Sequence, residues 1–240
     1  MRFGKNIVCL LFVWCLSMPQ AWTQDAVGDT ETKDCAGIPV ECVFIRQPVS
    51  ITFAGLSFAA GASPMLFESA RQQNVLIREK VQMWRRNEFD YKPLYFDNII
   101  QYVPVSAVVL LNMVGVPSRH NNMPLLRRTA LTMLLTFAVT QTMKYTITEL
   151  RPDRSSSNSF PSGHTAFAFS GAELLRLEYG ETSALIPVAG YAVAALTGFM
   201  RIYNDRHWAG DVMAGAALGI VMADVSYWLN EWMDRRVWTR

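Results

Sequence analysis

The sequence has little charge and almost no net charge. Only 18% of its 240 residues are Asp, Glu, Lys or Arg, and the formal net charge is +2, whereas an ordinary soluble domain carries about 25% charged residues. No basic run with interleaved aromatic residues is present, which argues against nucleic acid as a partner. Internal repeats and low-complexity tracts are absent as well. The length then fits one domain with a sizeable core.

Hydrophobic residues, by contrast, make up 51% of the chain, and the mean hydropathy is +0.14. These values suit a small membrane protein with a polar part outside the membrane, and they also suit a very apolar soluble bundle. Five strongly apolar segments, from short to adequate for a span of ~20 residues, follow residue 97. They cover residues 98–116, 128–147, 162–177, 183–200 and 209–229. We therefore predict an all-α fold, a multi-helix bundle integral to a membrane with about five or six apolar helices.

The N-terminal part predicts export. Residues 1–23 join a positively charged start to an apolar run of about a dozen residues, which is typical of a signal peptide and also of a short anchor. Residues 24–93 form the second predicted part, an exported polar and amphipathic segment, and residues 94–240 form the helical-bundle core. Within the second part, residues 49–62 are apolar, and whether they enter a bilayer stays open. The stretch after them predicts an amphipathic helix, on a membrane interface or on the bundle.

Two of the four cysteines stand in this N-terminal polar segment. Cys35 and Cys42 lie in DCAGIPVEC, while the other two belong to the first apolar run. If the segment is exported, Cys35 and Cys42 are spaced to close a small disulfide loop. The alternative is two free thiols.

Three short motifs in the second half carry the candidate chemistry. They are KYTITELRP, PSGH and RIYNDRHWAGD, and their chemically active residues are Lys144, Arg151, Ser162, Gly163, His164, Arg201, His207 and Asp211. Together these residues supply what is needed to bind a phosphate and to displace its leaving group without a metal. Each motif alone is weak, and their occurrence in order within about seventy residues is what makes them informative.

The spacing of the motif residues indicates how they act. His207 and Asp211 are four residues apart and share one face of a helix, so the carboxylate can hold one ring nitrogen and leave the other free to attack. PSGH predicts the start of a helix, where Gly163 allows a ligand to approach the backbone closely. A phosphate there would meet free N–H groups and the positive end of the helix dipole.

The remaining motif residues supply charge and a proton. Lys144, Arg151 and Arg201 can place fixed positive charge against the oxygens of a transferring phosphoryl group. His164 can act as the general acid that protonates the departing oxygen.

The ordered set Lys-x6-Arg-Pro, Pro-Ser-Gly-His and Arg-x5-His-x3-Asp resembles the type-2 phosphatidic acid phosphatase superfamily, which also holds bacterial class A acid phosphatases and vanadium-dependent haloperoxidases. The resemblance implies a helical bundle and a phosphohistidine intermediate on His207. It implies that Asp211 orients His207, that His164 is the acid, and that no metal or other cofactor is required. The phosphate contacts that it implies come from Lys144, Arg151, Ser162, Gly163 and Arg201. One departure is Met200, where the family usually has a small residue, and this bears on the shape of the pocket.

Each motif residue taken alone also has a structural interpretation. Arg151 before a proline can end a helix, Arg201 can flank a membrane span, and Lys144 can extend from a helix end toward water. The coincidence of the three spacings favours the catalytic interpretation. The third histidine, His120, sits in a polar loop without a partner motif, and we expect it to be structural.

Topology predicts where the site lies. If the apolar segments alternate across a bilayer, all three motifs fall on one membrane face, at the ends of helices. The opposite face then receives Arg119, Arg127, Arg128 and the C-terminal arginines, and by the positive-inside bias that face is cytoplasmic. We therefore expect a bacterial inner-membrane protein whose active site faces the periplasm.

The predicted function is hydrolysis of a phosphate monoester or diphosphate of an envelope lipid. The candidate substrates are lipid A, undecaprenyl diphosphate, phosphatidylglycerophosphate and phosphatidic acid, and the polar N-terminal part followed by five helices is similar to lipid A phosphatases. The alternatives are a soluble periplasmic acid phosphatase with the same site, a haloperoxidase in which His207 ligates vanadium, and a catalytically silent membrane scaffold or lipid-binding protein. The partners are thus a phosphorylated lipid and the bilayer, without nucleic acid, and the oligomeric state stays open.

Overall fold

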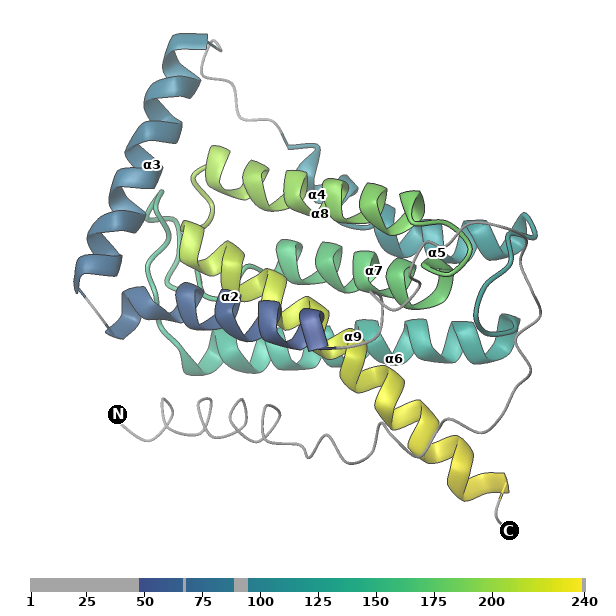
Figure 1. The fold of residues 1–240 in the computed structure, drawn as a ribbon. Coiled ribbons are helices and arrows are strands. Elements are labelled where there is room, and N and C mark those ends of the chain that lie inside the picture. Colours follow the sequence, from purple (N-terminus) through teal and green to yellow (C-terminus); the bar gives the residue numbers. More distant parts are fainter. Residues whose placement is uncertain (1–47, 67, 89–94, 239–240) are drawn as a thin grey trace. The chain divides into compact units, whose positions relative to one another are not determined.

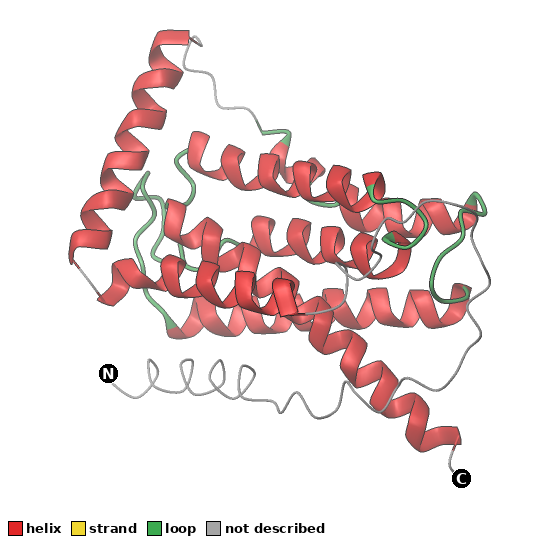
Figure 2. Cartoon of the chain, viewed as in Figure 1, coloured by secondary structure: helices red, strands yellow, loops and turns green. Residues whose placement is uncertain are grey.

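The computed structural model describes residues 48–66, 68–88 and 95–238, and in these ranges the chain forms helices joined by loops (Figures 1 and 2). The only extended pairing among them is one isolated bridge between Glu149 and Asn158. The chain divides into two units, Met1–Pro48 and Val49–Arg240, and the helices below belong to the second apart from the first residue of α2. The predicted all-α fold is confirmed. The predicted signal segment and the Cys35–Cys42 pair lie outside the described residues.

Apart from the charged helix at residues 68–88, the helices follow the apolar segments of the sequence. In chain order they are α2 (Pro48–Leu66), α3 (Glu68–Glu88), α4 (Asp97–Ile100), α5 (Val103–Met113), α6 (Asn122–Thr146), α7 (Gly163–Tyr179), α8 (Leu185–Tyr203) and α9 (Ala209–Trp238). The first predicted segment is divided into α4 and α5, because Pro104 occupies the first turn of α5 and favours a new helix start there. Gly115, with a φ of +83°, follows the end of α5 in the left-handed conformation that favours glycine.

Helix α7 is the centre of the bundle. It packs against α5, α6, α8 and α9, and its residues Leu174 and Tyr179 are fully buried. Small residues let α9 approach it closely. A Cβ atom built on Gly215 would lie 2.5 Å from the carbonyl oxygen of Ser162, and one on Gly219 would lie 2.8 Å from the amide nitrogen of Ser170. The α7–α9 contact is therefore made backbone against backbone.

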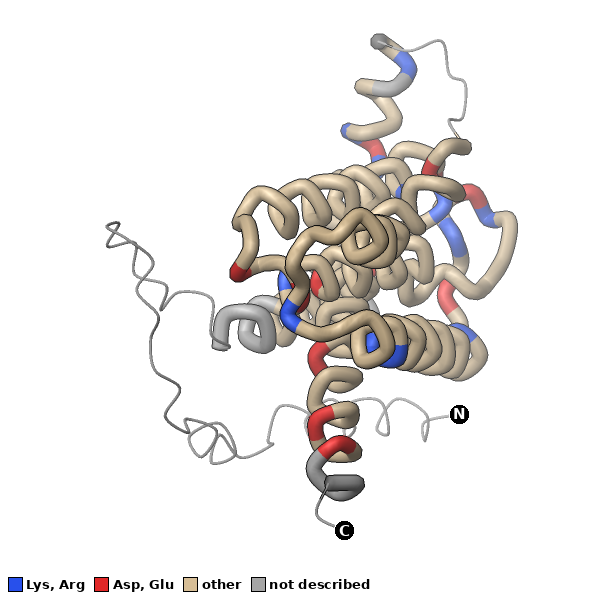
Figure 3. Tube along the Cα trace, turned by 90° about the vertical axis from the view of Figure 1, so that its right-hand side faces the viewer, with Lys and Arg blue, Asp and Glu red and all other residues tan. Residues whose placement is uncertain are grey.

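The outer surface of the bundle is apolar, while part of its interior is polar. On α6, Thr132 and Thr136 are fully buried, whereas Leu134 is 62% and Phe137 50% exposed. The helices in Figure 3 are accordingly coloured mostly as uncharged residues. Among the described helices, Leu185–Tyr203 and Ala209–Asp234 are long and apolar enough to cross a bilayer, judged by length and composition alone.

Helix α2 contacts α9, and helix α3 packs on α8 and α9. A Cβ atom on Gly61 of α2 would lie 2.5 Å from the carbonyl oxygen of Gly210, so α2 touches the start of α9. One face of α3 also faces the bundle, where Asn74 accepts a hydrogen bond from the amide of Gly210 at 3.1 Å. The amphipathic helix predicted after residue 62 thus packs on the bundle.

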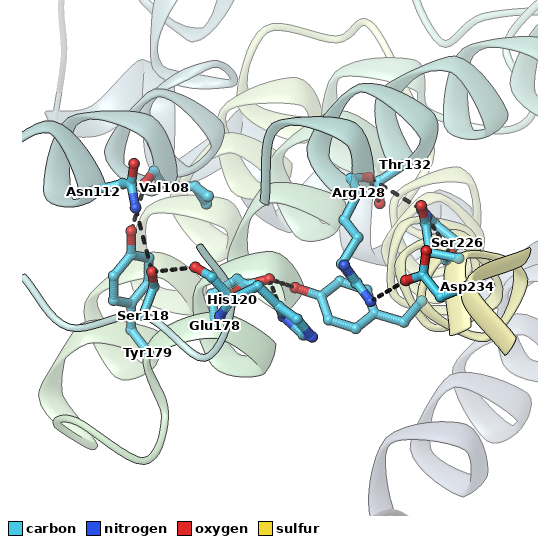
Figure 4. Close-up of polar contacts among 12 residues, drawn as sticks. Val108, Asn112, Ser118, His120, Arg128, Thr132, Glu178, Tyr179, Ser226 and Asp234 are labelled. Carbon is cyan, nitrogen blue, oxygen red and sulfur yellow. Dashed lines mark hydrogen bonds and ion pairs between the residues drawn. The ribbon is translucent and has the colours of Figure 1, made fainter. Parts of the chain in front are cut away.

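A polar network occupies the end of the bundle where α7 ends and α6 begins (Figure 4). His120 Nδ1 lies 2.9 Å from Oε1 of the buried Glu178, and Tyr227 donates its hydroxyl to the same carboxylate. Nearby, Arg127 pairs with Asp234 at 2.5 Å. His120 thus makes structural contacts, as expected, and Glu178 is the partner that the sequence did not indicate. The loop folds back so that the amide of His120 also donates to Glu178, a contact that local sequence does not reveal.

Candidate active site

The three motifs meet at the other end of the bundle, on the left in Figure 1. Lys144 lies in the last turn of α6, Gly163 opens α7 and Arg201 lies in the last turn of α8. His207 stands in the connection from α8 to α9, and Asp211 lies in the first turn of α9. The helices alternate in direction, so their motif-bearing ends come together. The three motifs thus lie together at one end of the bundle.

His207 and Asp211 form a buried pair. Both side chains are 2% exposed, and Nδ1 of His207 lies 3.5 Å from Oδ2 of Asp211. This distance is that of an ion pair and is longer than a normal hydrogen bond. The same Oδ2 accepts the hydroxyl of Ser159 at 2.5 Å and the backbone amide of Trp208 at 2.9 Å. The carboxylate is thus fixed on the Nδ1 side of the ring.

The start of α7 is hydrogen-bonded to the backbone of Asp211. The amide of Ser162 donates to the backbone carbonyl of Asp211 at 3.0 Å, and the hydroxyls of Ser162 and Thr165 lie 2.8 Å apart. The first amides of a helix have no intrahelical acceptor, and this contact places those of α7 next to the first turn of α9, which carries Asp211. A Cβ atom on Gly163 would meet Lys144 Cε at 3.7 Å. The PSGH motif and Lys144 are therefore neighbours.

Three cationic side chains lie close enough to repel one another. Lys144, Arg151 and Arg201 act on each other electrostatically, and Lys144 Nζ donates to the carbonyl of Asn158 at 2.9 Å. Among the described residues, the buried Nε atoms of Arg151 and Arg201 have no hydrogen-bond partner. Unsatisfied buried guanidinium nitrogens are costly. An oxyanion would satisfy these donors and neutralise their charge.

Burial keeps His207 neutral. It lowers the pKa of the imidazole to about 4, although the Asp211 carboxylate favours the charged form and opposes the shift. The cations Arg201 and Lys144 lower the pKa further. At neutral pH the ring therefore keeps a free lone pair, which is the form required of a nucleophile.

Several contacts of this end of the bundle were not predicted from the sequence. Asp97 on α4 binds Arg201, with 2.5 Å between Oδ2 and Nη1, and its neighbour Asn98 lies 2.9 Å from Nε2 of His164. Ser159 supports Asp211, and Arg78 on α3 pairs with Asp205 at 2.9 Å. Four of these residues belong to none of the three motifs, and their only sequence signal is a polar side chain next to an apolar segment or a motif: Arg78, Asp97, Asn98 and Ser159. No group of three His, Cys, Asp or Glu side chains that could hold a metal occurs in the part of the chain that the structure describes.

Comparison with known proteins finds a match to one family model. The model of the PAP2 superfamily matches residues 125–235, a range that contains all eight motif residues and leaves out Asp97 and Asn98. The chain is 44% identical over 140 residues to a lipid A 1-phosphatase of Porphyromonas gingivalis, covering 58% of this chain and 32% of that protein. It is 26% identical over 133 residues to an undecaprenyl-diphosphatase of Sulfolobus acidocaldarius, covering 49% of this chain and 58% of that protein. The chain thus spans about a third of the first relative and just over half of the second.

A solved structure shares the fold. A transmembrane PAP2-type phosphatidylglycerolphosphate phosphatase of Bacillus subtilis superimposes with a TM-score of 0.51 at 19% identity, covering 77% of this chain and 97% of that one. At this identity the likeness concerns the arrangement of helices.

Proposed function

We propose that this protein is a membrane-bound, metal-independent phosphatase acting on a phosphate monoester or diphosphate of an envelope lipid, because residues 125–235 match the model of the PAP2 superfamily. The observation that carries the proposal is the neutral, buried His207 beside Asp211, next to a cluster of cations. Two buried guanidinium nitrogens of that cluster have no partner among the described residues. This arrangement suits nucleophilic attack on a bound phosphate.

The proposed first step is transfer of the phosphoryl group to His207. The phosphate binds between Lys144, Arg151 and Arg201, against Ser162 and the first amides of α7. Because Nδ1 of His207 faces Asp211, Nε2 attacks phosphorus, the P–N bond forms and the bond to the leaving oxygen breaks. His164 gives its proton to that oxygen.

The proposed second step regenerates the enzyme. A water molecule gives a proton to the now neutral His164 and attacks phosphorus, the P–N bond breaks, and inorganic phosphate leaves. Asp211 stabilises the positive charge that His207 carries while it is phosphorylated.

A lipid substrate and a membrane location are supported by the apolar exterior of the bundle and by the names of the relatives. We place the protein in the bacterial inner membrane with its site toward the periplasm, because Arg119, Arg127 and Arg128 lie at the opposite end and the positive-inside bias puts them in the cytoplasm. The division into a targeting segment at 1–23, an exported part at 24–93 and a catalytic core at 94–240 belongs to the same proposal.

Phosphate release by the detergent-purified full chain, measured with a chelator present, tests the proposal. The panel comprises lipid A, undecaprenyl diphosphate, phosphatidylglycerophosphate, phosphatidic acid and a small soluble phosphate ester. Release from one lipid far above the soluble ester supports a lipid phosphatase and names its substrate. Equal release from the soluble ester would indicate a non-specific acid phosphatase, and loss of release on chelation would contradict metal independence.

The pH dependence of activity is expected to reflect the protonation of His207. Since kcat/KM reflects ionisations of the free enzyme, its acid limb should fall as the pH drops through about 4, where His207 takes up a proton. Asp211→Asn should move this acid limb to lower pH, because the carboxylate raises the pKa of the ring. A limb that moves to higher pH in Asp211→Asn would contradict the pairing.

Ser159→Ala is expected to lower kcat roughly tenfold with little change in KM. The serine hydroxyl is one of two donors to Asp211 Oδ2, and a hydrogen bond to a charged group contributes about 1.5–3 kcal/mol. Steady-state kinetics on the preferred substrate measure the effect. Ser157→Ala, at an exposed position of the same loop, is the matched control and should leave both constants unchanged. An unchanged kcat in Ser159→Ala would show that Asp211 needs no such support.

A further inference from the structure

The short helix α4 brings two adjacent polar residues to the candidate active site from outside the family match at 125–235. It lies beside α8 (Figure 1). Asp97 is fully buried and is held by two donors, Nη1 of Arg201 at 2.5 Å and Nδ2 of Asn204 at 3.3 Å. Gln101 donates to the carbonyl of Asn98 at 2.8 Å. The backbone of α4 is thus fixed against the last turn of α8, although Asn98 lies at the surface.

The position of Asn98 decides how His164 is held. Its Oδ1 lies 2.9 Å from Nε2 of His164. A carbonyl oxygen can only accept a hydrogen bond, so in this contact Nε2 carries a proton. The second ring nitrogen, Nδ1, is then the one that gains or loses the exchangeable proton.

We infer that Asn98 is a positioning residue for His164, which accepts a hydrogen bond from Nε2 and so assigns Nδ1 as the atom that delivers the proton to the leaving oxygen. This inference rests on the proposed phosphatase activity. In the first step the Nδ1–H bond breaks, the leaving oxygen gains the proton, and the neutral ring keeps its proton on Nε2. In the second step Nδ1 takes the proton from water. Asn98 therefore holds the ring in one orientation through both steps.

An amide suits this position better than a carboxylate. The charged or titratable groups that act on His164 are Arg201 on α8, Lys144 on α6, Arg151 in the loop before α7, and His207 before α9. A neutral acceptor holds both the protonated and the neutral ring. A carboxylate would stabilise the protonated ring strongly and so oppose release of the proton. The carboxylate of α4 instead lies one residue earlier, at Asp97, and binds Arg201.

Two substitutions of Asn98 test the inference. Asn98→Leu, which has about the same volume but no acceptor, should lower kcat about tenfold with KM changed little, a part of the 10²–10⁴-fold that a general acid contributes. Asn98→Asp keeps an acceptor and should shift the alkaline limb of the pH–kcat profile to higher pH. Ile99→Ala, at a position 72% exposed on the same helix, is the matched control and should match the wild type.

The outcomes separate this inference from the proposed function. A wild-type kcat in Asn98→Leu, or an alkaline limb that stays in place in Asn98→Asp, overturns the role of Asn98. If Asn98→Leu does not fold, the profile of Asn98→Asp decides alone, because a purely structural contact would not move it. Absence of phosphate release by the wild type would instead contradict the phosphatase proposal itself.

Discussion

Replacing His207 by alanine is expected to lower phosphate release by roughly 10⁴-fold or more, the range seen when a catalytic nucleophile is removed. The proposed mechanism passes through a bond between phosphorus and Nε2 of this ring, and no other imidazole in the site is held against a carboxylate. The fold should persist, since the variant removes a buried polar ring whose Nδ1 has no hydrogen-bond partner among the described residues. Phosphate release and thermal unfolding of the same preparation measure the two properties.

The intermediate can be observed directly. Brief incubation with a substrate labelled in its phosphate should give wild-type protein with one label that survives alkali and is lost in acid, as expected of a phosphoramidate. His207→Ala should take up none. His120→Gln changes the histidine at the opposite end of the bundle, keeps a hydrogen-bond donor for Glu178, and should label normally. Label on another residue, or retained turnover in His207→Ala, would contradict the assignment.

Gly219→Val is the second substitution with a large expected effect, and it should prevent a stable fold. Even the first side-chain atom would lie 2.8 Å from the amide nitrogen of Ser170 and closer still to the carbonyl oxygen of Ala166. Both atoms belong to the backbone of α7, so they cannot move aside without separating α7 from α9. Because α7 is the centre of the bundle, we expect a loss of more than about 4 kcal/mol, at the upper end for single substitutions.

Thermal unfolding and size-exclusion chromatography in detergent measure this loss. Ala195→Val adds two methyl groups at an exposed position of α8 and serves as the control, with an unfolding temperature close to the wild type. Gly219→Ala should fall between the two, because it adds the clashing Cβ atom alone. An unfolding temperature of Gly219→Val equal to that of the control would mean that α7 and α9 pack less closely than the structure describes.

The helical class and the place of the site were predictable from the sequence because both depend on local patterns. Apolar segments of helical length become α5–α9 whatever their neighbours, with α4 split off at the turn before Pro104. Helices that alternate in direction must bring the ends bearing Lys144, His164 and His207 to one side. Gly215 and Gly219 also indicate a close helix contact from the sequence alone, because glycine has no side chain to keep a neighbouring helix away.

The partners of the motif residues depended on the tertiary structure. Ser159 reaches Asp211 across 52 positions, Asn98 reaches His164 across 66 and Asp97 reaches Arg201 across 104, and His120 finds Glu178 across 58. The hydrophobic periodicity of the sequence indicates which face of a helix is apolar. It does not indicate which helix packs against that face, or at which position along the helix axis. A hydrogen bond requires two atoms within about 3 Å. That condition is set by the packing of the whole bundle, and so the residues that hold the motif side chains in place become visible only once the chain is folded.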